Sequence, residues 1–61
     1  MKTMKNFLFF DNLRGEYFFV QCGALSEAWD EACLVVEDED ELEYLGVYSD
    51  DEAEMMGYDT Y

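Results

Sequence analysis

Two aromatic-rich runs separated by a short turn place the strongest constraint on how this chain can fold. Residues 5–11 (KNFLFFD) and 16–22 (EYFFVQC) have the length and the aromatic and β-branched content of strands. The connecting residues 12–15 end in Gly15, which can adopt the positive φ that tight turns require. The pattern therefore predicts an antiparallel β-hairpin.

A helical periodicity follows the hairpin. Apolar residues recur at helical spacing between Leu25 and Val36, and acidic residues occupy intervening positions. Ser26 has the chemistry of an N-cap residue, so we expect the helix to run from Glu27 to about Val36. The single tryptophan, Trp29, lies on the apolar face, and we expect it to anchor the helix to the sheet.

Residues 42–48 (LEYLGVY) predict a third strand. Because side chains alternate along a strand, we expect Leu45 and Val47 on one face, and Tyr44 and Tyr48 on the other. Tyrosine supplies rigid contact area at protein interfaces, so the two tyrosines are also candidates for contact with a partner.

Ser49 and Glu52 have the spacing of a capping box. This pattern predicts a short helix over residues 50–56, ended by Gly57 just past its last turn. Residues 58–61 then form a tail.

The element order predicts an α+β fold, in which a three-stranded antiparallel sheet carries one main helix and is followed by a short C-terminal helix. We expect residues 1–61 to form a single small acidic domain. A chain of this length buries only about 60% of its unfolded surface. It leaves little room for the enclosed cleft that most enzymes need.

Several residue types that carry catalytic or metal chemistry are missing. Without histidine there is no imidazole base, and the commonest zinc ligand is absent. The acidic residues lack the glycine and the ligand spacing of an EF-hand loop. The chain also has no glycine-rich phosphate loop. We therefore expect no catalysis, no cofactor and no specific metal site.

The cysteines and the apolar runs indicate the cellular compartment. Cys22 and Cys33 fall on the apolar faces of a strand and a helix, and we expect small buried thiols rather than a disulfide. No apolar run approaches the roughly 20 residues of a membrane-spanning helix. The first residues also lack the pattern of a signal peptide. The sequence predicts a cytosolic protein with no membrane association.

The charges are separated along the chain. The net charge is −13, from 16 acidic and 3 basic residues, and the bases Lys2, Lys5 and Arg14 all lie in the first 14 positions. Residues 15–61 contain 15 acids and no base. A surface built for stability mixes the two signs, because like charges on a small fold repel one another. This cost favours a function that needs an anionic surface, although solubility alone would also explain it.

Residues 37–43 (EDEDELE) are the most acidic stretch, with six carboxylates in seven positions, and we expect a loop or a charged edge here. Phosphates on one strand of duplex DNA recur about every 3.4 Å along the axis. Carboxylates on one helix face lie about 5–6 Å apart, so a small rigid acidic fold can approximate an array of phosphates. Such a chain repels nucleic acid but attracts the basic grooves that bind it.

In its size, its charge, its lack of histidine and its order of hairpin, helix and strand, the whole chain resembles the small phage-encoded inhibitors that mimic DNA. Anti-CRISPR proteins are the largest such group, and anti-restriction proteins and inhibitors of uracil-DNA glycosylase are others. The segment 43–61 (EYLGVYSDDEAEMMGYDTY) is also phage-like in character. The resemblance implies a CRISPR effector subunit as the partner, in the cytoplasm of an infected bacterium. The chain would occupy the DNA-accepting surface of that subunit and block target recognition.

Two alternatives remain open. The chain could inhibit another nucleic-acid-binding defence enzyme, such as a restriction enzyme or a DNA glycosylase, or it could be an acidic phage accessory or structural protein. The sequence leaves the oligomeric state open. The candidate partner-binding residues are the acids of the most acidic stretch, two acids of the main helix, the acids of the C-terminal helix and two tyrosines: Asp30, Glu31, Glu37, Asp38, Glu39, Asp40, Glu41, Glu43, Tyr44, Tyr48, Asp50, Asp51, Glu52 and Glu54.

Overall fold

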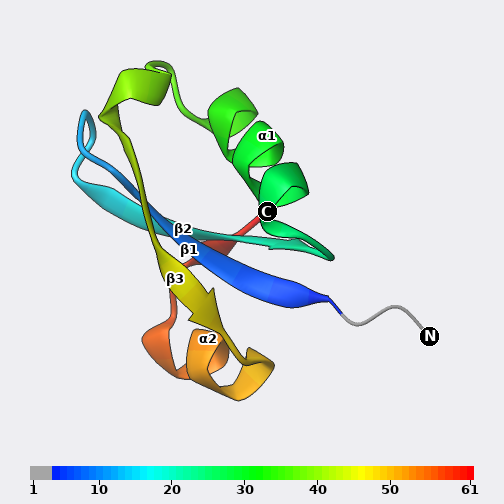
Figure 1. Ribbon diagram of the computed structural model, residues 1–61. Helices are drawn as coiled ribbons and strands as arrows, with labels where there is room; N and C mark the ends of the chain where they lie inside the picture. The colour runs from blue at the N-terminus through cyan, green and yellow to red at the C-terminus, as the bar shows by residue number, and fades with distance from the viewer. Residues whose placement is uncertain (1–3) are drawn as a thin grey trace.

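A computed structural model describes residues 4–61, which form a four-stranded mixed sheet with one helix on each face (Figure 1). The elements are the strands β1 (Lys5–Asp11), β2 (Glu16–Cys22), β3 (Leu42–Tyr48) and β4 (Asp59–Thr60), the α-helices α1 (Leu25–Val35) and α2 (Asp50–Met56), and the 3-10 helix η1 (Glu39–Glu41). The spatial order is β3-β1-β2-β4, so β3 and β4 are the edge strands. The basic residue Lys2 lies outside the described residues.

The predicted hairpin is confirmed, with both strands at the expected bounds and Gly15 at a φ of 70°. The buried side chain of Asp11 organises the turn. Its carboxylate accepts the backbone N–H of Leu13 at 3.0 Å and that of Arg14 at 3.4 Å, and its backbone carbonyl accepts the N–H of Gly15 at 2.7 Å. The turn is therefore fixed by hydrogen bonds from within the hairpin.

The larger part of the core lies between the sheet and α1. Phe9 of β1 is fully buried and its ring stacks on Phe18 of β2 at 5.7 Å between centroids. On the helix, Ala28 and Ala32 are the fully buried residues, and their small side chains let α1 approach the aromatic surface closely. Trp29 contacts Phe9 at 5.6 Å but remains 38% exposed. Trp29 therefore covers the rim of the core, and the expectation that it anchors the helix is only partly met.

The helix α1 begins two residues earlier than expected. Ala24 occupies the N-cap position without a side-chain cap, and its carbonyl accepts the N–H of Ala28 at 3.0 Å. Ser26 lies inside the first turn, so its assignment as the N-cap is wrong. The physical reason is that burial of Ala28 and Ala32 sets the position of the helix. A side-chain cap contributes only about 1 kcal/mol and does not override that packing.

The strand β3 has the predicted bounds but contains a β-bulge. Leu8 of β1 pairs with Gly46, whereas the next residue, Phe9, pairs with Tyr44, so Leu45 is left without a partner. Gly46 has a φ of 146°, which favours glycine. The extra residue reverses the alternation, and Tyr44 and Tyr48 lie on opposite faces of the sheet. The expectation that they share a face is wrong.

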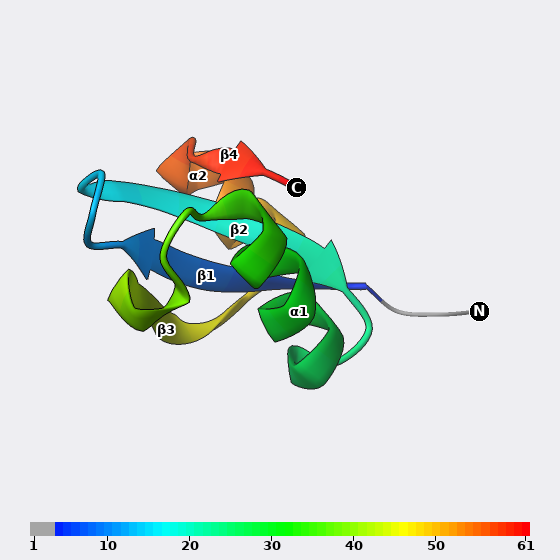
Figure 2. The same ribbon diagram turned by 90° about the horizontal axis from the view of Figure 1, so that it is seen from above.

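The C-terminal residues complete the second face. The helix α2 has the predicted bounds, its Ser49 cap accepts the N–H of Glu52 at 3.3 Å, and Gly57 follows at a φ of 72°. Residues 58–61 are not a free tail: Asp59–Thr60 form β4, which pairs in parallel with β2 (Figure 2). The sheet thus has four strands in mixed orientation, and the prediction of a three-stranded antiparallel sheet is corrected.

Candidate functional site

The acidic side chains face solvent almost without exception. Of the 16 acids, Asp11 is the buried one, and the other 15 are exposed. Within residues 4–61, a single ion pair is present, in which Nη2 of Arg14 lies 3.1 Å from Oε1 of Glu37. Among residues 4–61, no other exposed carboxylate lies within ion-pair distance of a cationic group of that same range. The charge separation seen in the sequence is therefore preserved in three dimensions.

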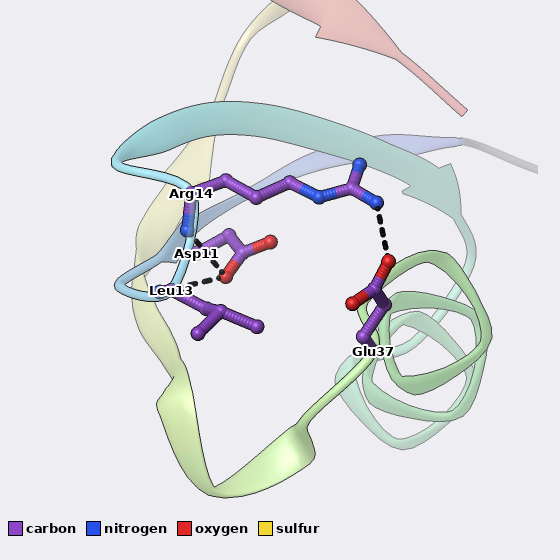
Figure 3. Close-up of polar contacts among 4 residues, drawn as sticks. All are labelled: Asp11, Leu13, Arg14 and Glu37. Carbon is purple, nitrogen blue, oxygen red and sulfur yellow. Dashed lines mark hydrogen bonds and ion pairs between the residues drawn. The ribbon is translucent and has the colours of Figure 1, made fainter.

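The ion pair joins two distant segments of the chain. Figure 3 shows the Arg14 side chain reaching from the β1–β2 turn to Glu37, just after the end of α1. The hydrogen bond and the charge of Glu37 raise the pKa of Arg14 above its usual value. Glu37, a candidate for partner contact, is therefore the candidate acid that has a cationic partner within residues 4–61, and its side chain remains exposed.

The candidate acids gather at the two ends of β3. The first group, called the η1 group, comprises Asp38, Glu39, Asp40, Glu41 and Glu43. The second, called the α2 group, comprises Asp50, Asp51, Glu52 and Glu54. The strand residues 42–48, at about 3.3 Å each, place η1 and α2 roughly 20 Å apart. The structure does not merge them into one patch; they flank the exposed edge strand (Figure 1).

The η1 group is held against the hairpin turn. The backbone N–H and the side-chain amide of Asn12 both donate to the carbonyl of Glu41, at 2.9 and 3.0 Å. The carboxylate of Asp38 accepts the N–H of Asp40 at 3.0 Å and so caps η1. These bonds give the most acidic stretch a defined backbone, where a loop or charged edge was expected.

Two acids of the α2 group have structural roles. Asp50 accepts a hydrogen bond of 2.7 Å from the side chain of the buried Asn6, which ties α2 to β1. Glu52 accepts a hydrogen bond of 3.2 Å from the hydroxyl of Ser49. Asp51 and Glu54 are exposed on the same helix. Asp30 and Glu31 are likewise exposed on α1, across the sheet from this group.

The two candidate tyrosines have different surroundings. Tyr44 lies on the α1 face, 36% exposed, with its ring centroid 5.6 Å from that of Phe9. Tyr48 lies on the opposite face, half-buried, with its ring 6.1 Å from that of Phe19. They cannot contribute to one contact surface, and Tyr44 is the more accessible of the two.

An open hollow of about 550 Å³ lies between α1 and β3, lined by Leu25, Ser26, Trp29, Asp30 and Tyr44. Sequence reasoning included Asp30 and Tyr44 among the site residues, but it placed Trp29 and Leu25 on the buried face of the helix. One signal was present in the sequence: Trp29 directly precedes the acidic Asp30, so it lies next to the polar side of the helix.

Both cysteines are free thiols, as expected. Cys22 is buried, and Cys33 is partly buried. Burial, followed by a hydrogen bond to the carboxylate of Glu39, raises the pKa of the Cys33 thiol. A thiol with a raised pKa holds less thiolate at neutral pH, and this disfavours a role as a nucleophile.

Residues 4–61 hold neither a cluster suited to a metal ion nor a helix that could span a membrane. In that range no three Cys, Asp or Glu side chains come together in a way that could hold a metal ion. The helices of the described chain also lack the length and apolarity needed to cross a membrane. Comparison of the chain with protein-family models, with curated proteins and with solved structures finds no match.

Proposed function

We propose that this protein is an anti-CRISPR-type inhibitor, an acidic DNA mimic that binds the basic DNA-accepting surface of a CRISPR effector complex. The proposal rests on one observation. Fifteen carboxylates are exposed on a fold of 34 × 23 × 15 Å, and Glu37 is the one with an ion-pair partner within residues 4–61. A surface of this kind repels itself and is complementary to a Lys/Arg-lined groove.

The dimensions of the fold support mimicry of a short duplex. Its long axis of 34 Å matches the rise of about ten base pairs at 3.4 Å each. The η1 and α2 groups, roughly 20 Å apart along β3, span a distance covered by about six phosphates on one DNA strand. Two anionic groups at this spacing can engage a groove that contacts the DNA backbone at several points.

Binding of this kind is collective. A single exposed ion pair contributes about 0–1 kcal/mol, so no one carboxylate dominates. Attraction between many charges speeds the encounter and weakens as salt screens it. Tyr44 is the exception among the candidate residues, because an accessible aromatic ring at an interface can be a hot spot by itself.

A plasmid-protection assay tests the proposal. The chain is expressed in bacteria that carry different CRISPR types or different restriction systems, and each strain is challenged with a plasmid bearing the matching target. We expect the plasmid to survive in at least one CRISPR strain only when the chain is present. Protection in restriction strains alone would assign the chain to the other class of defence inhibitors. The absence of protection in every strain would contradict both.

A pull-down then tests the physical basis. The tagged chain is incubated with lysate of the protected strain at low and at high salt. We expect it to recover the CRISPR effector at low salt and to lose it at high salt. Recovery that does not depend on salt would contradict an electrostatic mimic.

A further inference from the structure

We propose that the hollow between α1 and β3 is a socket for one arginine side chain of the partner protein. The proposal builds on the function above, because it assumes a partner rich in basic residues, but the socket can be tested without any effector. Its lining residues are Leu25, Trp29, Asp30 and Tyr44, with Ser26 at the helix start.

The two aromatic walls share one support. The rings of Trp29 and Tyr44 each lie 5.6 Å from the ring of Phe9, which is fully buried beneath them. The two rings are therefore separated by at most twice that distance. A cation placed over the face of either ring would lie within the roughly 6 Å at which cation–π attraction acts.

Both rings are partly open to solvent. Trp29 is 38% exposed and Tyr44 is 36% exposed. Both rings are inclined to Phe9, by 56° and 51°, so neither stacks flat on the core. Part of each aromatic surface thus remains in contact with solvent at the hollow, where a ligand can reach it.

The chemistry of the walls selects arginine. Trp is the strongest cation–π partner among the aromatic residues, and Asp30 adds a carboxylate at the same hollow. Leu25, 42% exposed, offers an apolar surface for the methylene stem of a long basic side chain. A guanidinium is planar and weakly hydrated, so it stacks on aromatic rings with less desolvation cost than an ammonium.

Charge argues against the other occupants. The net charge of −13 disfavours an anionic ligand at this surface, and it also disfavours a second copy of the same chain. Asp30 favours a basic side chain over a purely apolar one, because only the basic one gains a charge-assisted contact with its carboxylate. The hollow therefore fits a basic residue on the surface of the partner. Binding there would add one specific contact to the long-range attraction between the acidic chain and the basic partner.

The single tryptophan makes occupancy of the socket directly visible. The probe is a blocked Gly-Gly-Arg-Gly-Gly peptide, with lysine and citrulline versions as controls; citrulline keeps the shape of arginine but carries no charge. Titration is followed by the fluorescence of Trp29 and by the NMR shift of its indole N–H. We expect a saturable change with the arginine peptide, a weaker one with lysine, and none with citrulline.

Two variants test the walls. Asp30→Asn and Tyr44→Leu are each expected to weaken arginine binding by about threefold or more. Asp59→Asn is the matched control, since it removes the same charge from β4, at the opposite edge of the sheet. Equal binding of citrulline and arginine, equal binding of lysine and arginine, or equal weakening by Asp59→Asn and Asp30→Asn would each overturn the socket.

Failure of the socket can be told apart from failure of the proposed function. If the peptide does not bind but the chain still protects plasmids from a CRISPR system, the socket is wrong and the mimic stands. If the arginine peptide binds as described but no CRISPR or restriction system is inhibited, the socket stands and the proposed function is wrong.

Discussion

Replacement of Trp29 by alanine tests how the helix α1 is held on the sheet. Truncation of a fully buried Trp or Phe to Ala costs about 3–5 kcal/mol. Trp29 is 38% exposed, and scaling by its buried fraction gives about 2–3 kcal/mol. For a domain of this size, 1 kcal/mol lowers the melting temperature by about 4–8 °C, so we expect a loss of roughly 10–20 °C.

Two further variants bracket this value. Phe9→Ala removes a side chain with no exposed surface, and its cost of about 3–5 kcal/mol equals the entire stability expected for so small a core. We expect this variant to be unfolded at room temperature. Leu34 is 81% exposed, and Leu34→Ala should change the stability by less than about 0.5 kcal/mol.

Thermal and urea denaturation followed by far-UV circular dichroism measure all three variants at one fixed salt concentration. The structure predicts the order Phe9→Ala, then Trp29→Ala, then Leu34→Ala, from most to least destabilised. If Trp29→Ala unfolds the chain as Phe9→Ala does, Trp29 is a core anchor and its placement at the rim of the core is refuted. If it behaves like Leu34→Ala, the packing of Trp29 on Phe9 is refuted.

Three other predictions concern polar groups. The buried side chain of Asn6 donates a hydrogen bond to Asp50, so Asn6→Ala should lower the free energy of unfolding by about 1.5–3 kcal/mol. Asn6→Asp should destabilise the fold more than this at pH 7, and its stability should recover as the pH falls and the new carboxyl is protonated. Thermal melts at several pH values measure both variants. The pKa of the Cys33 thiol is raised in the fold. The protonated thiol therefore contributes its full stabilisation at pH values below its pKa in the unfolded chain, and this contribution is lost as the pH rises through its pKa in the folded chain. Alkylation of Cys33 by iodoacetamide should be slower in the folded chain than in urea, and faster in Glu39→Gln; equal rates would contradict the shift. Added NaCl should raise the melting temperature by screening the unpaired carboxylates, and a fall would contradict the repulsion.

Elements with a strong local pattern were predictable from the sequence. The hairpin and β3 have the expected bounds because their apolar and aromatic runs match the period of a strand. The helix α2 also has the expected bounds, since Ser49 and Gly57 mark its two ends by side-chain and backbone chemistry that needs no tertiary contact.

Features set by tertiary contacts were not predictable. The strand β4 has two residues and no periodicity, and it forms because the backbone of Tyr61 donates to Phe19 at 2.8 Å and accepts from Gln21 at 2.9 Å. The bulge at Leu45 inserts an unpaired residue into β3, and the strand keeps the residue types typical of a regular strand. Gly46, which follows Leu45, is the one residue whose type indicates such an irregularity.

The sequence predicts which residues make up the candidate site better than it predicts how they are arranged in space. The sequence shows the number of acids and their separation from the bases, and the structure confirms that nearly all are exposed. Their division into two groups at the ends of β3 depends on the sheet topology. The pairing of Glu37 with Arg14 across 23 positions and the hollow beside Tyr44 depend on it as well. None of these can be read from local spacing.

Competition for a DNA-binding effector tests the central claim most directly, and the structure specifies which acids to change. Glu39→Gln, Asp40→Asn and Glu41→Gln together neutralise η1, while Asp38 keeps its capping bond and Glu37 keeps its ion pair. A matched triple variant, Glu16→Gln, Glu27→Gln and Asp59→Asn, removes the same charge from exposed positions outside the candidate site.

The measurement is the concentration of each chain that displaces half of the target DNA from a purified CRISPR effector, after circular dichroism has shown that each is folded. At about 0.5 kcal/mol for each lost ion pair, the η1 triple variant should be roughly tenfold weaker than the wild type. The matched triple variant should be weaker by less than about threefold, because it acts only through long-range charge. Equal potency of the two triple variants, or potency of the η1 variant equal to the wild type, would contradict DNA mimicry by this surface.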